Sequence, residues 1–186
     1  MSWFGSGYDA FNADVARQAG RTDYAGNGGD AGLAHGAGPS TIAAGLASTA
    51  KPAFTGVLYE RSEVTLGKVS DGTSKTYLAG EKYLDAAHYT TGGDPADNET
   101  WNTGWNNDNY RVGKPSTNGS QHFQPWRDKV GVRDTVRFGG PHEAGFNAVF
   151  VDGHVETVAF DIAPEIHADN CNRKDGGRAA QLGVNP

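Results

Sequence analysis

Residues Phe138–Phe160 read FGGPHEAGFNAVFVDGHVETVAF. In this stretch two runs of β-forming residues, Phe146–Val151 and His154–Phe160, are separated by Asp152-Gly153. An Asp-Gly pair between two such runs is the strongest short-range signal for a β-hairpin, because both residues of the tight turn need a positive φ. The sequence therefore predicts a strand, a two-residue turn and a second strand.

A two-residue loop also predicts which side chains share a face of the hairpin, since cross-strand partners lie on one side and faces alternate along each strand. One face is almost wholly apolar and is expected to lie on the core: Phe146, Ala148, Phe150, Val155, Thr157 and Ala159. The other face is mixed and is expected to be partly wet: Asn147, Val149, Val151, His154, Glu156 and Val158. A different turn type would swap these faces, so the prediction depends on the loop length.

The same stretch carries a resemblance to a known family. His142 is followed by nine residues and then by Asp152-Gly153. This spacing resembles the H-X9-DG signature of the bacterial prepilin-type, processing-associated proteins, the family of domain of unknown function 1559. Four further segments agree with that family in their order along the chain: Arg21–Asp30, Ser70–Leu84, Asp97–Arg111 and Cys171–Gly176. No single motif is specific, whereas five motifs in the right order are.

The segments of the chain predict an α+β fold dominated by an antiparallel sheet, and the resemblance implies the globular head of a pilin-like or pseudopilin-like protein. In such a head an antiparallel sheet with long irregular loops packs with a short N-terminal helix. The implied role is structural: an extracellular or cell-surface subunit of a filament, a secretion apparatus or a larger assembly. His142, Asp152 and Gly153 then form a folding signature that combines a loop anchor, a strand and a tight turn. Members of the family usually begin with a pilin-like leader and a long apolar helix, and this chain as written shows neither.

Size and composition agree with a single loop-rich domain. The chain has 186 residues, including 27 glycines and 8 prolines, and a formal net charge of -6. This length is enough for a real core, and the glycine and proline content predicts many turns. Acids and bases are interspersed, so no basic surface for nucleic acid is expected. No stretch approaches the ~20 apolar residues of a membrane span, and residues 1–20 lack the apolar region of a signal peptide, so no membrane insertion of the chain as written is predicted.

Three segments are expected along the chain: residues 1–20 with a short helix, residues 21–177 as the globular domain, and residues 178–186 as a tail. The helix is predicted over Asp9–Ala19, because Tyr8, Phe11 and Val15 recur at helical spacing. The glycine-rich stretch 21–40 is expected to be an irregular loop. Strands are predicted for Phe54–Tyr59, Ser62–Val69 and the start of Thr76–Leu84, and short helices for Thr41–Ala50 and Ala163–Asn170.

Aromatic residues near the N-terminus are candidates for an assembly contact. Trp3, Phe4, Tyr8 and Phe11 lie within the first eleven residues, and a few aromatic anchors usually carry most of an interface's energy. We expect residues 1–11 to contact a neighbouring subunit or another protein. The alternative is that Trp3 and Phe4 staple the short helix internally.

The polar stretch from His88 to Gln124 has three competing interpretations. The first is a solvated or self-packed surface loop. The second is a calcium site, because Ca²⁺ prefers carboxylate, amide and carbonyl oxygens, and Asp97, Glu99 and Asp108 are the candidate ligands. The third is a carbohydrate platform formed by Trp101, Trp105 and Tyr110, since flat aromatic faces beside amides suit a sugar ring. The segment 94–110 is thus the alternative functional region, a surface module for calcium or carbohydrate.

Enzymatic activity is not expected from the sequence. The chain has six histidines, and none forms the i, i+4 pair of a helical zinc site. His142 and Asp152 are separated by a strand of about 20 Å at ~3.3 Å per residue, so they are expected to lie too far apart for acid–base chemistry. Cys171 is the single cysteine and is expected to be a buried or half-buried free thiol.

Overall fold

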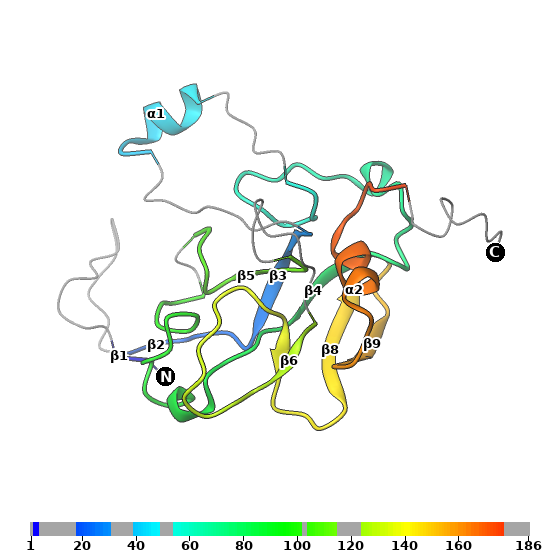
Figure 1. Ribbon diagram of the computed structural model, residues 1–186. Coiled ribbons are helices and arrows are strands. Elements are labelled where there is room, and N and C mark those ends of the chain that lie inside the picture. Colours follow the sequence, from blue (N-terminus) through cyan, green and yellow to red (C-terminus); the bar gives the residue numbers. More distant parts are fainter. Residues whose placement is uncertain are drawn as a thin grey trace.

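The computed structural model describes residues 2–3, 18–30, 39–48, 54–101, 104–114 and 124–176. Its centre is a five-stranded sheet in the order β5-β3-β4-β8-β9 (Figure 1). The strands are β3 (Tyr24–Gly29), β4 (Tyr77–Glu81), β5 (Tyr110–Val112), β8 (Gly145–Phe150) and β9 (Val155–Ala159). Neighbours are antiparallel except β3 and β5, which are parallel. The predicted mixture of helix and mostly antiparallel sheet is confirmed.

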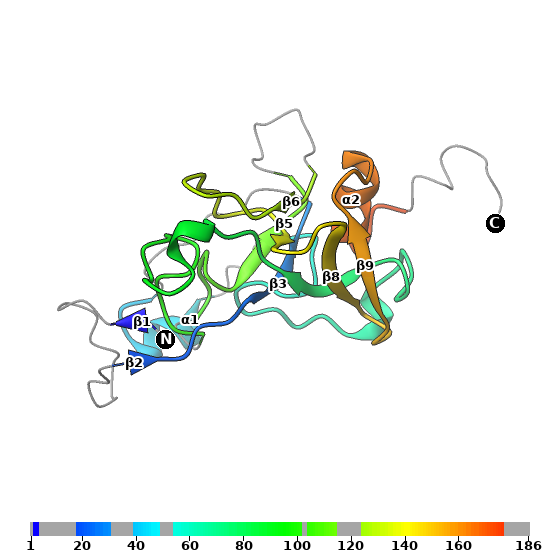
Figure 2. The same ribbon diagram turned by 90° about the horizontal axis from the view of Figure 1, so that it is seen from below.

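Short elements surround this sheet. Two small strand pairs are β1 (Ser2–Trp3) with β2 (Gln18–Ala19) and β6 (Trp126–Arg127) with β7 (Gly139–Gly140). The helices are α1 (Ile42–Ala47), α2 (Pro164–Cys171) and the 3-10 turns η1 (Leu66–Lys68) and η2 (Ala86–His88). Helix α1 buries no side chain and stands apart from the sheet, whereas α2 lies on one face beside β8 (Figures 1 and 2).

An aromatic core fills the space between the sheet and α2. Its buried members are Tyr77, Phe138, Phe146, Ala148, Phe150, Val158 and Cys171. The Tyr77 ring meets Phe138, Phe146 and Phe150 edge-on at centroid distances of 5.9, 6.0 and 5.1 Å. Such edge-to-face contacts add to the stabilisation from apolar burial. Cys171 is the buried free thiol that the sequence predicts, and burial raises its pKa.

The hairpin of β8 and β9 is confirmed, but its predicted two-residue loop is wrong. Val149 pairs with Val155, and the Phe150 N–H donates to His154 O at 2.9 Å. The Gly153 N–H donates to Phe150 O at 2.9 Å, and Gly153 has a φ of 92°. The loop therefore has one residue more than predicted and runs from 151 to 153, in the usual form of a turn followed by a left-handed glycine.

Because of this extra residue, the side chains of β9 that face the core are the opposite set from the predicted one, whereas β8 keeps its predicted faces. Phe146, Ala148 and Phe150 are buried as predicted. The core residue that β9 supplies is Val158, which pairs with Phe146, while Val155 is 65% exposed. Thr157 and Ala159 are exposed with Val155. A one-residue change in register moves a whole set of side chains to the opposite face, which explains the error.

The glycine-rich segment predicted as an irregular loop contains the central strand β3. Glycines on both sides let another segment pack directly on the strand: a Cβ on Gly26 would lie 2.8 Å from Leu58 Cβ, and a Cβ on Gly56 would lie 2.3 Å from Asn27 O. The N–H groups of Val57 and Leu58 donate to the same Asn27 O at 3.0 and 2.9 Å. The strand predicted for 54–59 is thus a loop bound to β3, and the one predicted for 62–69 contains the turn η1.

The remaining strand and helix predictions in the globular part agree with the structure. Strand β4 lies within 76–84, α1 within 41–50, and α2 begins at Pro164.

The side chain of Asn27 connects β3 to neighbouring elements, because its Nδ2 donates to Tyr77 O at 2.7 Å and to Cys171 O at 3.0 Å. The described helices include none long and apolar enough to cross a membrane.

Most of the predicted N-terminal helix lies outside the described residues, as do Phe4, Tyr8 and Phe11. Its last two positions, Gln18 and Ala19, form β2 and pair antiparallel with Trp3 and Ser2 of β1. The helix predicted up to Ala19 is therefore wrong at its C-terminal end, where backbone pairing replaces it. The predicted tail 178–186 also lies outside the described residues.

Candidate functional site

A buried ion pair attaches the polar loop 94–109 to the sheet. Lys82 directly follows β4, and its Nζ donates to Asp97 Oδ1 at 2.7 Å, to Ala96 O at 3.1 Å and to Asp108 O at 3.0 Å. The Arg21 guanidinium binds the other carboxylate oxygen of Asp97, and it donates to the Asp97 carbonyl at 2.9 Å. Both oxygens of Asp97 are thus bound by cations.

Burial and ion pairing shift the pKa values of Asp97 and Lys82 in opposite directions. Burial raises the pKa of Asp97, and the nearby charges of Lys82 and Arg21 act against that rise. Burial lowers the pKa of Lys82 and the Arg111 charge adds to this, whereas Asp97 opposes it. Removing one member of such a pair leaves an uncompensated buried charge, so the two residues depend on each other.

Other polar side chains of the loop also turn inward to hold its backbone. Asp94 accepts from the N–H groups of Asp85 at 2.6 Å and Ala96 at 2.9 Å. Asp108 Oδ1 accepts from the Glu99 N–H at 2.9 Å. Arg111 is fully buried and donates to Asn107 O at 2.6 Å and to Tyr110 O at 2.7 Å. In its described part the loop is thus self-packed, with carboxylates in place of a local apolar core.

The structure brings the three predicted calcium ligands near one another without forming a metal site. Asp108 lies against the Glu99 backbone, while the Glu99 carboxylate accepts from Asn106 Nδ2 and Asp97 is bound by Lys82 and Arg21. Among the described residues, no three His, Cys, Asp or Glu side chains are placed to hold one ion. Calcium binding stays a prediction, and it requires Asp97 to exchange its cationic partners for the ion.

Two of the predicted carbohydrate residues, Trp101 and Trp105, line one surface hollow, here named the aromatic groove. Trp105 stacks on Tyr110 with ring centroids 4.3 Å apart and an interplanar angle of 14°. Tyr110 is buried, Trp105 is half-buried and Trp101 is 65% exposed. The groove has a volume of about 530 Å³ and is lined by Gly26, Leu58, Tyr59, Glu60, Arg61, Ser62, Trp101, Gly104, Trp105 and Asn109. Trp101 and Trp105 thus form one wall, and Tyr110 supports it from beneath.

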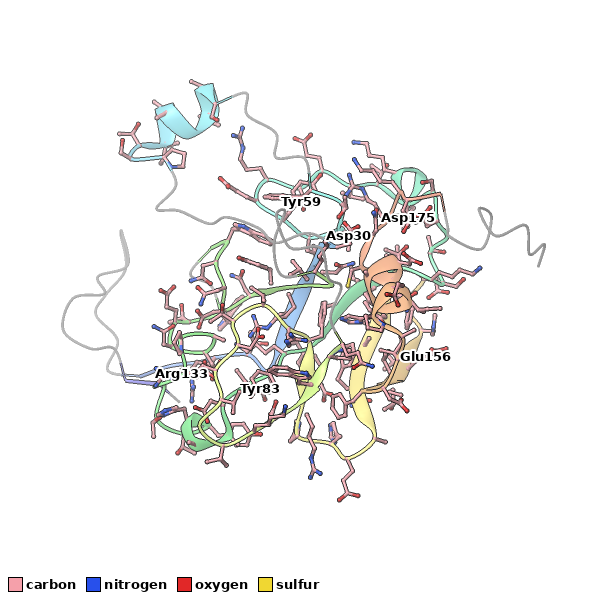
Figure 3. All side chains as sticks on the ribbon, viewed as in Figure 1. Asp30, Tyr59, Tyr83, Arg133, Glu156 and Asp175 are labelled. Atoms are coloured by element: carbon pink, nitrogen blue, oxygen red, sulfur yellow. The ribbon has the colours of Figure 1, made fainter. Side chains whose placement is uncertain are left out.

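Sequence reasoning missed the opposite wall of the groove, residues 58–62. This segment reads as the end of a strand followed by a charged turn, and its position opposite Trp101 and Trp105 depends on the packing of Gly56 against β3. Figure 3 labels Tyr59 in this segment and Asp30, which follows β3 and accepts a hydrogen bond from the Thr55 hydroxyl. Tyr59 also packs edge-on to Phe54 at 5.1 Å, and Phe54 lies 6.0 Å from Trp105. The groove is therefore assembled by tertiary packing, for which the local sequence carries no signal.

The two ends of the H-X9-DG signature have separate structural tasks. His142 Nε2 lies 3.1 Å from Glu81 Oε1 at the end of β4, and the same carboxylate accepts from the Asn147 N–H at 2.7 Å. Asp152 accepts from the His154 N–H at 3.1 Å in the hairpin loop, and hydrogen bonds from the His154 side chain and backbone lower its pKa. His142 therefore anchors the segment before β8 to β4, and Asp152 with Gly153 shapes the turn after it.

A second hollow, of about 380 Å³, lies beside Glu81 and is lined by Asp23, Tyr24, Glu81, Lys82, Leu84, Tyr89, Asp128, Gly140 and Pro141. Its polar groups are largely used within the fold. Asp128 accepts from the Tyr89 hydroxyl at 2.5 Å and from the Leu84 N–H at 3.0 Å. Glu81 binds Asn147 and His142 as described above. These contacts join Leu84 and Tyr89, on either side of η2, to Asp128, and they join the end of β4 to His142 and β8.

One comparison with known proteins finds a match. A family model described as "Protein of unknown function (DUF1559)" matches residues 9–165, which is more than half of the chain. The matched region includes every strand of the central sheet, both walls of the aromatic groove and the segment from His142 to Gly153. No curated protein and no solved structure matches the chain.

Proposed function

The chain belongs to the DUF1559 family of proteins of unknown function, and on this premise we propose that it is a non-enzymatic structural subunit of an extracellular or cell-surface assembly. A pilin-like filament or a secretion apparatus is the kind of assembly that the H-X9-DG resemblance implies. The structural observation that carries the proposal is the open edge of the central sheet at β9.

Strand β9 is the last strand in the sheet order. The Phe150 N–H donates to His154 O, and the Phe160 N–H donates to Ala144 O at 3.3 Å. Because hydrogen-bonded and non-bonded pairs alternate in antiparallel strands, the backbone groups of Val155, Thr157 and Ala159 point away from β8. In the described part of the chain, only Ala159 O on this side has a backbone partner, the Ile162 N–H at 3.2 Å.

The side chains of β9 do little to protect this edge. The strand reads VETVA and contains no proline or lysine, the residues that often block pairing at sheet edges. Val155 is 65% exposed, and Glu156 is the single charged residue of the strand (labelled in Figure 3). An exposed edge of this kind is a template for a strand of another chain. It therefore supports a role in assembly.

Several charged side chains that could act in catalysis are instead bound to other groups of the fold, which supports a non-enzymatic role. Lys82, Asp97 and Arg21 are bound to one another, and Glu81 holds His142 and the Asn147 backbone. These groups fix loops to the sheet, so the fold uses them to make a rigid body.

Light scattering and electron microscopy of the protein test the proposal. We expect particles larger than one chain, and we expect Thr157→Pro to reduce their mass, because proline removes an outward N–H from the edge without removing a bond to β8. Thr157→Val keeps this N–H and serves as the matched control. The proposal fails if the parent protein is a monomer at every concentration, or if Thr157→Pro assembles as the control does while keeping the parent melting temperature.

A further inference from the structure

We propose that the aromatic groove binds a neutral saccharide. This inference goes beyond the assembly role, because the groove is lined by residues 58–62 together with Gly26, Trp101, Gly104, Trp105 and Asn109 and does not involve β9. The proposal rests on the exposed tryptophan, on the rigid support of the groove and on the polar groups of its opposite wall.

The groove presents flat aromatic surface to solvent. Trp101 is 65% exposed and Trp105 is half-buried, although the described core buries several other aromatic rings completely. The C–H face of a sugar ring packs well on an indole ring, which offers a large apolar surface with few rotatable bonds. A volume of about 530 Å³ lies in the usual range of small-ligand sites, roughly 300–1,000 Å³.

The tryptophan wall is held in place before any ligand arrives. Trp105 stacks on Tyr110, a buried residue of β5. The backbone on either side is fixed by Lys82 donating to Asp108 O at 3.0 Å, and by the Trp101 N–H donating to Gly20 O at 3.2 Å. A rigid site loses less conformational entropy on binding, so a weakly interacting ligand gains affinity from this arrangement.

The opposite wall contains a strained turn. Arg61 has a φ of 59° and is, among the described residues, the non-glycine residue with positive φ. Its guanidinium donates to Ser48 O at 2.6 Å, and the Ser62 N–H donates to Tyr59 O at 2.9 Å. Unfavourable backbone conformations of this kind concentrate at ligand sites, where the surrounding structure maintains them. Here the turn places Glu60 and Ser62 on the groove wall.

The polar chemistry of this wall favours a neutral ligand rich in hydroxyl groups. In the part of the chain that the structure describes, the Glu60 carboxylate and the Ser62 hydroxyl have no protein partner, so they are able to bind sugar hydroxyls. A purely apolar ligand would cover these groups without a hydrogen bond, which is unfavourable. A phosphate or sulfate would meet the negative charge of Glu60, while the Arg61 guanidinium is directed to Ser48.

Binding is tested with cellohexaose, chitohexaose and maltohexaose, by titration calorimetry and by tryptophan fluorescence. We expect at least one of these neutral oligosaccharides to bind and to change the fluorescence. Trp101→Ala should weaken binding about tenfold or more, and Glu60→Gln should also weaken it. Both positions are at the surface, so both variants should keep the parent melting temperature.

Tyr24→Ala is the matched control, because Tyr24 is an exposed aromatic residue outside the groove. It should leave saccharide affinity unchanged, as should Thr157→Pro on the sheet edge. The inference is overturned if none of the three oligosaccharides binds at millimolar concentration. It is equally overturned if binding occurs but Trp101→Ala and Glu60→Gln leave it at the level of the Tyr24→Ala control.

Discussion

Lys82 Nζ lies 2.7 Å from Asp97 Oδ1, and the two side chains are 1% and 5% exposed. This buried pair joins the end of β4 to the long polar loop that carries the tryptophans of the aromatic groove. The attraction within such a pair offsets the cost of removing both charges from water, so the net contribution of the pair is small while the loss of one member is costly. The pair therefore determines where the loop is fixed.

Removing the cation of this pair should destabilise the whole domain. We expect Lys82→Met to lower the free energy of unfolding by about 3–5 kcal/mol, because Asp97 would lose a buried partner. Urea unfolding followed by tryptophan fluorescence measures the change. Lys75→Met is the matched control, since Lys75 is exposed, and it should stay within about 0.5 kcal/mol of the parent. A Lys82→Met variant as stable as this control would show that the pair is not structural.

The three-residue loop of the hairpin makes a prediction that separates the two registers. Val158 is buried in the core and Val155 is exposed. We expect Val158→Ala to cost about 1–3 kcal/mol, as a loss of buried methyl groups, and Val155→Ala to change stability by less than about 0.5 kcal/mol. Chemical denaturation of both variants gives the comparison. A larger loss of stability for Val155→Ala than for Val158→Ala would instead support the two-residue loop.

Two further substitutions test the hairpin itself. Phe150→Ala should cost about 3–5 kcal/mol, because the ring belongs to the aromatic core. Gly153→Val should also destabilise the protein, by roughly 1–2 kcal/mol, because a β-branched residue resists a φ of 92°. Nothing lies within 4 Å of a Cβ added at Gly153, so this cost comes from the backbone alone. Denaturation midpoints equal to the parent for both variants would argue against the strand–turn–strand.

The sequence predicts this hairpin well because its signals are local. Alternating apolar residues and an Asp-Gly pair are sufficient to predict β8, β9 and the turn between them. The local sequence does not predict the register of the hairpin, because loops of two and three residues both accept Asp-Gly. The choice between the two loops depends on which face of β9 meets the core. Val158 rather than Val155 packs with Phe146, and that fact belongs to the tertiary structure.

The central strand β3 and the aromatic groove were harder to predict. Strand β3 reads YAGNGG and lacks the alternating pattern of a strand, because a loop packs where side chains would be. The groove needs this packing to bring residues 58–62 opposite Trp101 and Trp105. Composition alone predicts the aromatic residues themselves, whereas their partners across the groove are distant in sequence and share no motif with them.

His167 should make stability depend on pH. The ring is fully buried against Tyr77, Phe138 and Phe146, and among the described residues neither nitrogen has a hydrogen-bond partner. Burial, with the Arg137 charge as a smaller cause, lowers the pKa of His167 from 6.5 to about 3. Between these values the unfolded chain binds the proton and the folded chain does not. Stability from this residue is therefore present above pH 6.5 and is lost as the pH falls towards about 3.

His167→Phe isolates this effect. The variant keeps an aromatic ring in the core and removes two buried nitrogens without partners, so we expect it to be at least as stable as the parent at neutral pH. As the pH falls from 6.5 to about 3, the stability of the variant relative to the parent should increase. Urea unfolding at a series of pH values measures this difference. A difference that is constant over the range would mean that His167 titrates alike in both states.

Calcium binding by Asp97, Glu99 and Asp108 is tested by thermal unfolding. An ion that binds only the folded state raises the melting temperature, and a chelator lowers it again. Asp97→Asn should abolish the response, because it removes a ligand charge. A melting temperature that responds neither to calcium nor to EDTA, on protein shown to be metal-free, removes the hypothesis.

The last prediction concerns the contact proposed for residues 1–11. Trp3 pairs through its backbone with Gln18, and deletion of residues 1–7 therefore removes β1. If the aromatic residues of this segment contact a neighbouring subunit, their loss should prevent assembly, since a few anchors carry most of an interface's energy, about 2 kcal/mol or more each. The core of the domain lies in the sheet and α2, far along the chain from this segment, so the melting temperature of the remaining domain should be unchanged.

Light scattering and thermal unfolding of the same deletion variant separate this contact from internal packing. Loss of particle mass at the parent melting temperature supports the contact, and Thr157→Pro then shows whether the sheet edge acts with it. A large fall in melting temperature would instead assign Trp3 and Phe4 to the packing of their own domain. Assembly that survives the deletion would leave β9 as the proposed assembly surface, because its outward backbone groups do not depend on residues 1–7.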